Sequence, residues 1–279
     1  MGIFIERIHL NLQGNDQELR TLALLKILRL EAEYIEDPDQ APTLIQTLRR
    51  IYYNEKGEIA NLAIRARVRL GKILSEFLET AGDRRRCLDQ LRNKKSSAQE
   101  ILQALWTLAN EGKSEDLILC ASYLEHKNLK IRIGALEVFL GKASIEDLVH
   151  LSYSLSDPSP PARFLTKLVF EKFSADQILN TFQVLKNSTQ ADIRKKAALA
   201  LQGLDFIPET SQMLLDLCLD PVLEIRLLAI SALGNHPTPQ VIEKLKELQN
   251  DLSIEVCETA TKAIEAIKKK EMDELLTIP

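Results

Sequence analysis

Residues 220–234 read DPVLEIRLLAISALG. Apolar side chains recur every three or four positions in this stretch, which is the spacing of one face of an α-helix. Asp220 and Pro221 suit the start of a helix, because a carboxylate accepts hydrogen bonds from free amides and proline needs no amide partner there. Gly234 is suited to end the helix in the left-handed conformation. The stretch therefore predicts one short helix with a marked beginning and end.

A second helical segment follows in the same unit. Thr238 can cap it, with Pro239 at its first helical position, and apolar residues recur at helical spacing as far as Leu248. Asn250 and Asp251 then close this unit and begin the next. One unit is thus expected to be two antiparallel helices joined by short turns.

The unit repeats along the chain at a nearly constant period. With Arg226 as the anchor of its unit, equivalent anchors are Arg132, Arg163, Arg194 and Cys257, separated by 31, 31, 32 and 31 residues. Weaker copies have anchors at Ala98, Ala63 and Arg20, with steps of 34, 35 and 43 residues. Unrelated amphipathic helices would not keep this register, so the chain is predicted to be a repeat protein.

The repeat decides the fold class. No segment shows the alternating pattern of a strand, and one helix pair cannot bury its apolar face alone. We therefore predict an all-α protein, an α-solenoid of about eight stacked antiparallel helix pairs with no sheet. We expect one continuous solenoid with irregular repeats over 1–123, regular repeats of about 31 residues over 124–268, and a C-terminal tail over 269–279.

Composition excludes several kinds of site. The four cysteines and four histidines of the 279 residues are dispersed without metal-ligand spacing, so neither a metal nor another cofactor is predicted. The apolar runs are far shorter than the ~20 residues that a membrane span needs, and no secretory signal is visible. We expect a cytoplasmic protein.

Residues 220–234 resemble the HEAT-repeat family, whose pattern is Asp-Pro-x-x-x-(Ile/Val)-Arg-x-x-Ala-x-x-Ala-Leu-Gly. The repeat length is similar to that of the short bacterial branch that includes the phycobilisome lyases. The resemblance implies that the second helix of each pair lines a concave face. It also implies an internal ladder of aspartate and arginine, here formed by Asp157, Arg163, Arg194, Asp220 and Arg226. Cys257, Ala98 and Ala63 depart from the pattern by replacing the anchor arginine.

No catalytic residues are predicted. A di-iron hydroxylase of this repeat class needs repeated His-Glu pairs, but Lys127 follows His126 and Pro237 follows His236. Phosphate-binding glycine loops and serine-nucleophile motifs are also absent from the sequence. We therefore expect a protein that is not an enzyme.

The charge distribution is more informative than the total. The formal net charge is −4, yet residues 49–95 carry 13 basic and 6 acidic residues. Arg65, Arg69 and Lys72 fall on one helix face, whereas Arg67 points away from it. An arginine run follows at Arg84, Arg85 and Arg86. These six basic residues are our predicted binding residues, because such a patch attracts phosphates, acidic proteins or anionic membrane surfaces.

The sequence favours a non-enzymatic scaffold or adaptor that recognises a protein partner through an extended solenoid surface. One alternative is a nucleic-acid-binding or DNA-glycosylase-like protein that uses the basic segment 49–95. Another is a lyase or chaperone for a cofactor- or bilin-carrying protein, which rests on the family resemblance alone.

Overall fold

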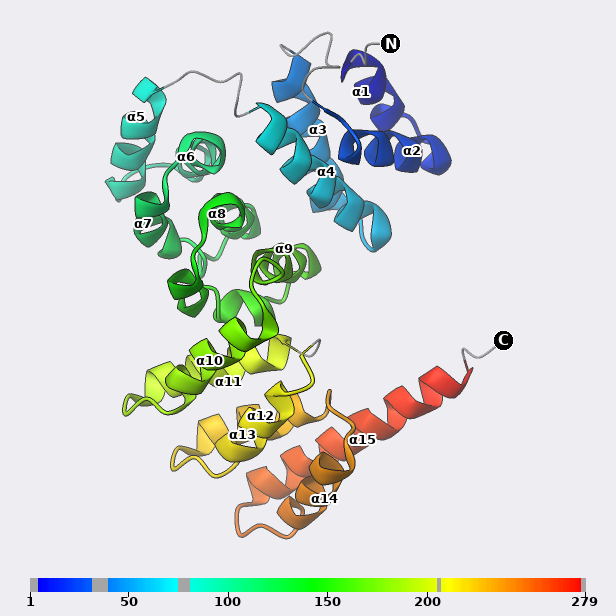
Figure 1. Ribbon diagram of the computed structural model, residues 1–279, viewed down its shortest axis with the longest axis vertical. Helices are drawn as coiled ribbons and strands as arrows, with labels where there is room; N and C mark the ends of the chain where they lie inside the picture. The colour runs from blue at the N-terminus through cyan, green and yellow to red at the C-terminus, as the bar shows by residue number, and fades with distance from the viewer. Residues whose placement is uncertain (1–4, 32–39, 75–80, 205–206, 277–279) are drawn as a thin grey trace. The chain divides into compact units, whose positions relative to one another are not determined.

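The computed structural model describes residues 5–31, 40–74, 81–204 and 207–276 (Figure 1). Within these ranges the chain forms fifteen α-helices and short 3-10 turns, and it contains no strand. The predicted all-α solenoid is confirmed. In the same part of the chain, no helix is long and apolar enough to cross a membrane.

The contacts divide the chain into two compact units. Unit 1 comprises residues 1–143 and 158–169, and unit 2 comprises residues 144–157 and 170–279. The single continuous solenoid with a change of regularity at residue 124 stays a prediction.

Unit 1 contains four helix pairs and most of a further helix. In each pair the two helices pack against each other, and α2 contacts α4 while α6 contacts α8. The pairs are α1 (Ile5–Gln13) with α2 (Gln17–Leu28), α3 (Ala41–Asn54) with α4 (Glu58–Leu74), α5 (Ala81–Arg92) with α6 (Ala98–Glu111), and α7 (Leu117–Ala121) with α8 (Leu129–Lys142). The 3-10 turn η3 (Ser114–Asp116) precedes α7, and α9 (Pro160–Phe170) lies in this unit up to residue 169.

Local sequence explains where the helices of unit 1 begin. Ser97 and Glu100 form a capping box at the start of α6, so each side chain satisfies a free backbone amide. At the start of α8, the Asn128 side chain accepts a hydrogen bond from the Lys130 amide. The apolar faces then pack inward, as in α1, where Ile5, Ile8 and Leu12 are buried.

Unit 2 contains three regular helix pairs, in which α11 contacts α13 and α13 contacts α15. The pairs are α10 (Ala175–Lys186) with α11 (Ala191–Gly203), α12 (Thr210–Leu217) with α13 (Leu223–Leu233), and α14 (Pro239–Leu248) with α15 (Ile254–Leu276). As predicted, the Thr238 side chain caps α14 and Pro239 stands at its first position. The predicted anchors, from Arg20 to Cys257, all lie on second helices of pairs or on α9.

Two details of residues 220–234 differ from the prediction. The Asp220 carboxylate accepts from the Val222 amide, which closes a turn, and α13 begins only at Leu223. Pro221 therefore precedes the helix. Gly234 is right-handed, with φ of −59°. A Cβ atom there would lie 3.4 Å from the Ala263 backbone, so its small size allows α15 to approach closely.

The region around residue 150 interrupts the regular pattern. In place of a full first helix, unit 2 has two short 3-10 turns, η4 (Ile145–Val149) and η5 (Tyr153–Ser156). Pro158 follows η5, and because proline has no amide to donate, it prevents η5 from continuing directly into α9. The division into two units falls in this region.

The C-terminal helix α15 extends beyond the boundary expected from the sequence. Residues 269–279 were expected to form a tail, but α15 continues to Leu276. The extension consists largely of lysine, glutamate, methionine and leucine, which are strong helix formers.

Candidate functional site

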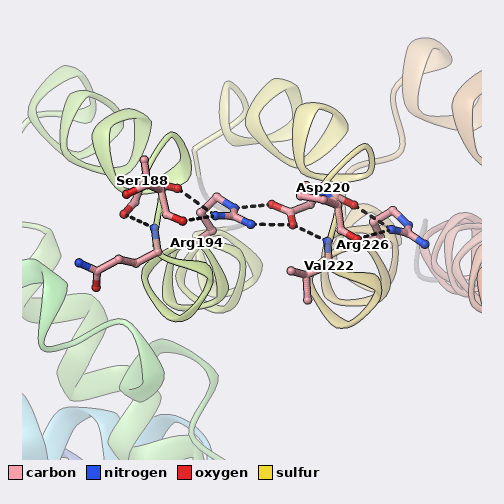
Figure 2. Close-up of polar contacts among 8 residues, drawn as sticks. Ser188, Arg194, Asp220, Val222 and Arg226 are labelled. Carbon is pink, nitrogen blue, oxygen red and sulfur yellow. Dashed lines mark hydrogen bonds and ion pairs between the residues drawn. The ribbon is translucent and has the colours of Figure 1, made fainter.

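A polar ladder links consecutive repeats of unit 2 (Figure 2). The Arg194 guanidinium in α11 donates to both carboxylate oxygens of Asp220, over 2.6 Å from Nε and 3.1 Å from Nη2. Asp220 in turn accepts from the Val222 amide over 2.9 Å, and its carbonyl oxygen accepts from Arg226 Nη1 over 2.8 Å. One aspartate therefore connects the second helix of its own repeat to that of the preceding repeat.

The anchor side chains make the same hydrogen bond, to a backbone carbonyl oxygen of the preceding turn. Arg194 Nη1 donates to the Ser188 carbonyl oxygen over 3.0 Å, six residues earlier in the chain. Arg132 Nη1 in unit 1 makes the equivalent bond to the His126 carbonyl oxygen, also over 3.0 Å. Cys257, which replaces arginine, still directs its Sγ to the carbonyl oxygen of Asp251, six residues earlier. The repeat is thus defined by a contact as well as by a pattern of residues.

The Asp220 carboxyl remains ionised. Burial by itself raises the pKa of Asp220, but the hydrogen bonds and charge of Arg194 and the Val222 amide outweigh burial and hold that pKa below its usual range. Of the other residues assigned to the ladder, Asp157 is buried in unit 2 and Arg163 lies on α9 in unit 1. The ladder bonds stabilise the repeats. The Arg194 guanidinium and the Asp220 carboxylate, which a ligand could otherwise contact, are hydrogen-bonded within the protein.

The three basic residues assigned to α4 have different surroundings. Arg65 is exposed, and its guanidinium carbon lies 5.6 Å from the centre of the Phe164 ring in α9. Arg69 is half-buried and donates to the Leu30 carbonyl oxygen over 2.7 Å. The Lys72 side chain lies outside the described part of the structure. On α4, Arg65 is therefore the described basic residue that faces solvent.

The three arginines of α5 also differ in their surroundings. Arg84 is held by Asp116, over 2.6 Å to Oδ1 and 2.9 Å to Oδ2, and by Glu115 over 2.5 Å. Arg85 and Arg86 are exposed. Together with Asp89, Gln90 and Asn93 they line an open hollow on the surface of α5. Arg84 fixes α5 to η3, whereas Arg85 and Arg86 are available for contacts.

A buried charged cluster, which the sequence did not predict, joins four helices of unit 1. Its centre is Glu137 in α8, whose side chain is 1% exposed. Glu137 Oε2 lies 2.6 Å from Arg49 Nη2 in α3 and 3.0 Å from Arg67 Nη2 in α4. The Tyr52 hydroxyl donates to the other carboxylate oxygen, and the Arg49 guanidinium covers the Trp106 ring of α6 at 4.1 Å.

The cluster is ionised although it is buried. Burial raises the pKa of Glu137, but the charges of Arg49 and Arg67 outweigh burial and keep the pKa of Glu137 below its usual range. Burial also raises the pKa of Tyr52 well above its usual value, so its hydroxyl remains a donor to Glu137. Because two cations surround one anion, the cluster carries a surplus of positive charge.

A cavity of about 230 Å³ adjoins this cluster. It is lined by residues of α4, α6 and α8 and by none from unit 2: Arg67, Val68, Gly71, Ala109, Asn110, Glu137, Leu140, Gly141 and Lys142. Lys142 Nζ also donates to the Ala109 carbonyl oxygen over 2.8 Å. The cavity thus has charged and amide groups on its wall.

The sequence contained a weak signal for this cluster. Glu137 is the one charged residue in Ile133–Leu140, a stretch that packs into the core. Arg67 was predicted to point away from the Arg65 face, and it lies buried. Sequence alone could not find that the two meet, because they are seventy positions apart and in different repeats.

The described cysteines and acidic residues give no further site. Burial raises the pKa of Cys120 and of Cys218 to about 12, so neither thiol ionises readily. Cys87, beside the arginine run, is also buried. Within the described ranges, no group of three or more histidine, cysteine, aspartate or glutamate side chains could hold a metal ion.

The ladder geometry agrees with a comparison of the sequence with known families. Residues 178–265 match HEAT repeats. This HEAT segment lies within unit 2 and contains Arg194, Asp220, Arg226 and Cys257. No curated protein matches the chain.

Several solved structures are similar to the chain at low identity. An engineered protein is 15% identical with a TM-score of 0.34, and the match covers 95% of this chain and 96% of that one. Human deoxyhypusine hydroxylase in complex with glycerol is 16% identical with the same coverage and a TM-score of 0.34. Computationally designed armadillo repeat proteins for modular peptide recognition are 14% identical, with coverage of 93% and 98% and a TM-score of 0.34. Nothing about the ligands of this chain follows from these likenesses.

Proposed function

We propose that this protein is a non-enzymatic cytoplasmic scaffold that binds a protein partner, and that the exposed basic face of α5 is part of the contact surface. HEAT and armadillo repeats commonly provide surfaces for protein partners. α5 is the first helix of its pair with α6, so the proposed contact face differs from the surface of second helices that the family resemblance implied.

The observation that carries the proposal is the state of Arg85 and Arg86. Both side chains are exposed beside a hollow, while the neighbouring Arg84 is fully engaged by Asp116 and Glu115. Lys94 and Lys95, just after α5, are exposed as well. The nearby Asp89 lies 3.5 Å from Arg92, which offsets its charge. The face therefore suits an acidic protein segment.

Arg65 is a second proposed contact, on α4. Its guanidinium lies over the Phe164 ring, which orients the charge without neutralising it. Arg69 is less suited to a partner, because its guanidinium already donates to the Leu30 carbonyl oxygen. The contact surface predicted from the sequence is thereby narrowed to Arg65, Arg85 and Arg86 among the described side chains.

A nucleic acid is the alternative ligand for the same basic face. Two observations disfavour a nucleic acid. The overall charge is −4. The Trp106 ring is covered on one side by the Arg49 guanidinium, so that side is not open to a base. The proposal of a lyase or chaperone for a bilin-carrying protein rests on the family resemblance, and none of the described contacts favours it.

Affinity capture from a native extract distinguishes a protein partner from a nucleic acid. The tagged full-length protein is incubated with and without nuclease, at low and at high salt. We expect a discrete protein that survives nuclease treatment and is partly lost at high salt, because basic contacts are screened. Recovery of nucleic acid alone, lost at high salt, would overturn the scaffold proposal.

A further inference from the structure

The cavity beside the buried charged cluster has the donors of an anion site. Arg67 is 5% exposed, and its Nε has no hydrogen-bond partner. Its Nη2 is engaged by Glu137 over 3.0 Å and, more weakly, by the Asn110 side chain over 3.4 Å. A buried guanidinium with unused donor capacity is costly, and an acceptor in the adjoining cavity would offset that cost.

The position of Gly71 shows where the Arg67 guanidinium meets the cavity. A Cβ atom built at Gly71 would come within 2.9 Å of Arg67 Nη1 and 3.6 Å of Asn110 Oδ1. Gly71 itself lines the cavity. The absence of a side chain at this position therefore leaves room next to Nη1 and Asn110 on the cavity wall.

The charges around the cavity also favour an anion. Three cationic side chains lie at or beside the cavity: Arg49, Arg67 and Lys142. The one carboxylate, Glu137, is already paired with both arginines. Asp116 lowers the positive potential at Lys142, but Asp116 is itself paired with Arg84. Of the charged side chains that line the cavity, two are cationic, Arg67 and Lys142, and one is anionic, Glu137.

We propose that this cavity binds a small oxyanion, of the phosphate or carboxylate class, between Arg67, Asn110 and Lys142. Guanidinium and ammonium groups form their strongest hydrogen bonds with such oxyanions. The volume of about 230 Å³ suits a free anion of a few heavy atoms better than a drug-sized ligand. The site is separate from the α5 face and does not depend on the proposed scaffold function.

Isothermal titration of the full-length protein tests the proposal, with inorganic phosphate as one probe and acetate as the other, at constant ionic strength in chloride. We expect saturable binding of at least one probe at one site. Lys142→Met removes one charged donor while keeping a long side chain, and it should weaken binding about tenfold. Gly71→Ala places a methyl group against Arg67 Nη1 and should weaken binding as well.

Lys127→Met is the matched control. Lys127 is exposed, precedes α8 and does not line the cavity, so its loss changes the net charge by the same amount without touching the site. Binding to this variant should equal binding to the unmodified protein. Absence of saturable binding of both probes overturns the proposal, and so does equal weakening by Lys127→Met and Lys142→Met.

Discussion

Glu137 is the residue on which unit 1 depends most. Its carboxylate is shared by Arg49, Arg67 and Tyr52, and these partners come from two other helices. Buried ion pairs are costly to form, but breaking one is costlier, because the remaining charges stay buried without compensation.

The first prediction concerns this carboxylate. Glu137→Gln should lower the free energy of unfolding by about 3–5 kcal/mol, because two buried arginines lose their counter-charge. Urea unfolding measures the change. Glu125→Gln, at an exposed position of the same unit, should change stability by less than about 0.5 kcal/mol. Equal effects of the two substitutions would show that the cluster does not hold the unit together.

The second prediction concerns Asp220. Because its pKa is lowered from the ordinary value of 3.8, its contribution to stability is present above that value and is lost as the pH falls through the lower native value. In Arg194→Met the opposing effect of burial remains, so the pKa of Asp220 should rise. An NMR titration of the Asp220 carboxyl measures this. An unchanged pKa in the variant would contradict the assigned role of Arg194.

At the scale of single residues, the sequence predicted the ladder members better than the cluster. Arg194 and Arg226 recur with the repeat, and the resemblance to the HEAT-repeat family implied that they and Asp220 belong to a ladder. The cluster residues do not recur with the repeat. Glu137 comes from a different helix pair than Arg49 and Arg67, so their contact depends on how those pairs pack. The predicted binding residues include Arg84 and Arg69, which the structure shows with partners within the protein.

At the scale of the helices, glycine positions show how tightly neighbouring elements pack. Gly203 ends α11 against η5, and a Cβ atom there would lie 2.5 Å from Leu155 Cβ and 2.7 Å from the Leu155 carbonyl oxygen. Gly141 in α8 has no atom within 4 Å of a built Cβ. Both glycines are helical, but only Gly203 lies in close contact with a neighbouring element.

The third prediction follows from this contrast. Gly203→Ala should destabilise the protein by about 1–3 kcal/mol, because backbone and side chain of Leu155 must shift. Gly141→Ala should stabilise it by up to about 1 kcal/mol, because alanine favours the helix more than glycine does. Thermal unfolding of both variants measures the two signs. A stabilising Gly203→Ala would mean that η5 does not pack closely on α11.

The pairing of helices could be predicted from apolar spacing and turn residues, as the capped start of α14 shows. The irregular elements could not. The turns η4 and η5 lie where a first helix was expected, and α15 runs past its expected end to Leu276. The length of α15 depends on a feature outside the repeat pattern, the helix-forming residues that continue past the expected end.

At the scale of the whole molecule, two compact units share one kind of repeat. Unit 2 contains the regular HEAT segment and its ladder, and unit 1 contains the less regular repeats with the buried cluster and the basic face. The regular repeats therefore lie in unit 2, and the exposed basic face of α5, on which the proposed function rests, lies in unit 1.

The central claim is that exposed charge on α5 binds a protein partner, and the affinity for the captured partner tests it most directly. Arg85→Glu combined with Arg86→Glu should weaken binding by about tenfold or more, because it reverses two charges at the contact. Lys246→Glu combined with Lys262→Glu makes the same change of charge at exposed positions of unit 2 and should leave the affinity unchanged. If reversal at Arg85 and Arg86 leaves the affinity unaltered, the claim is contradicted.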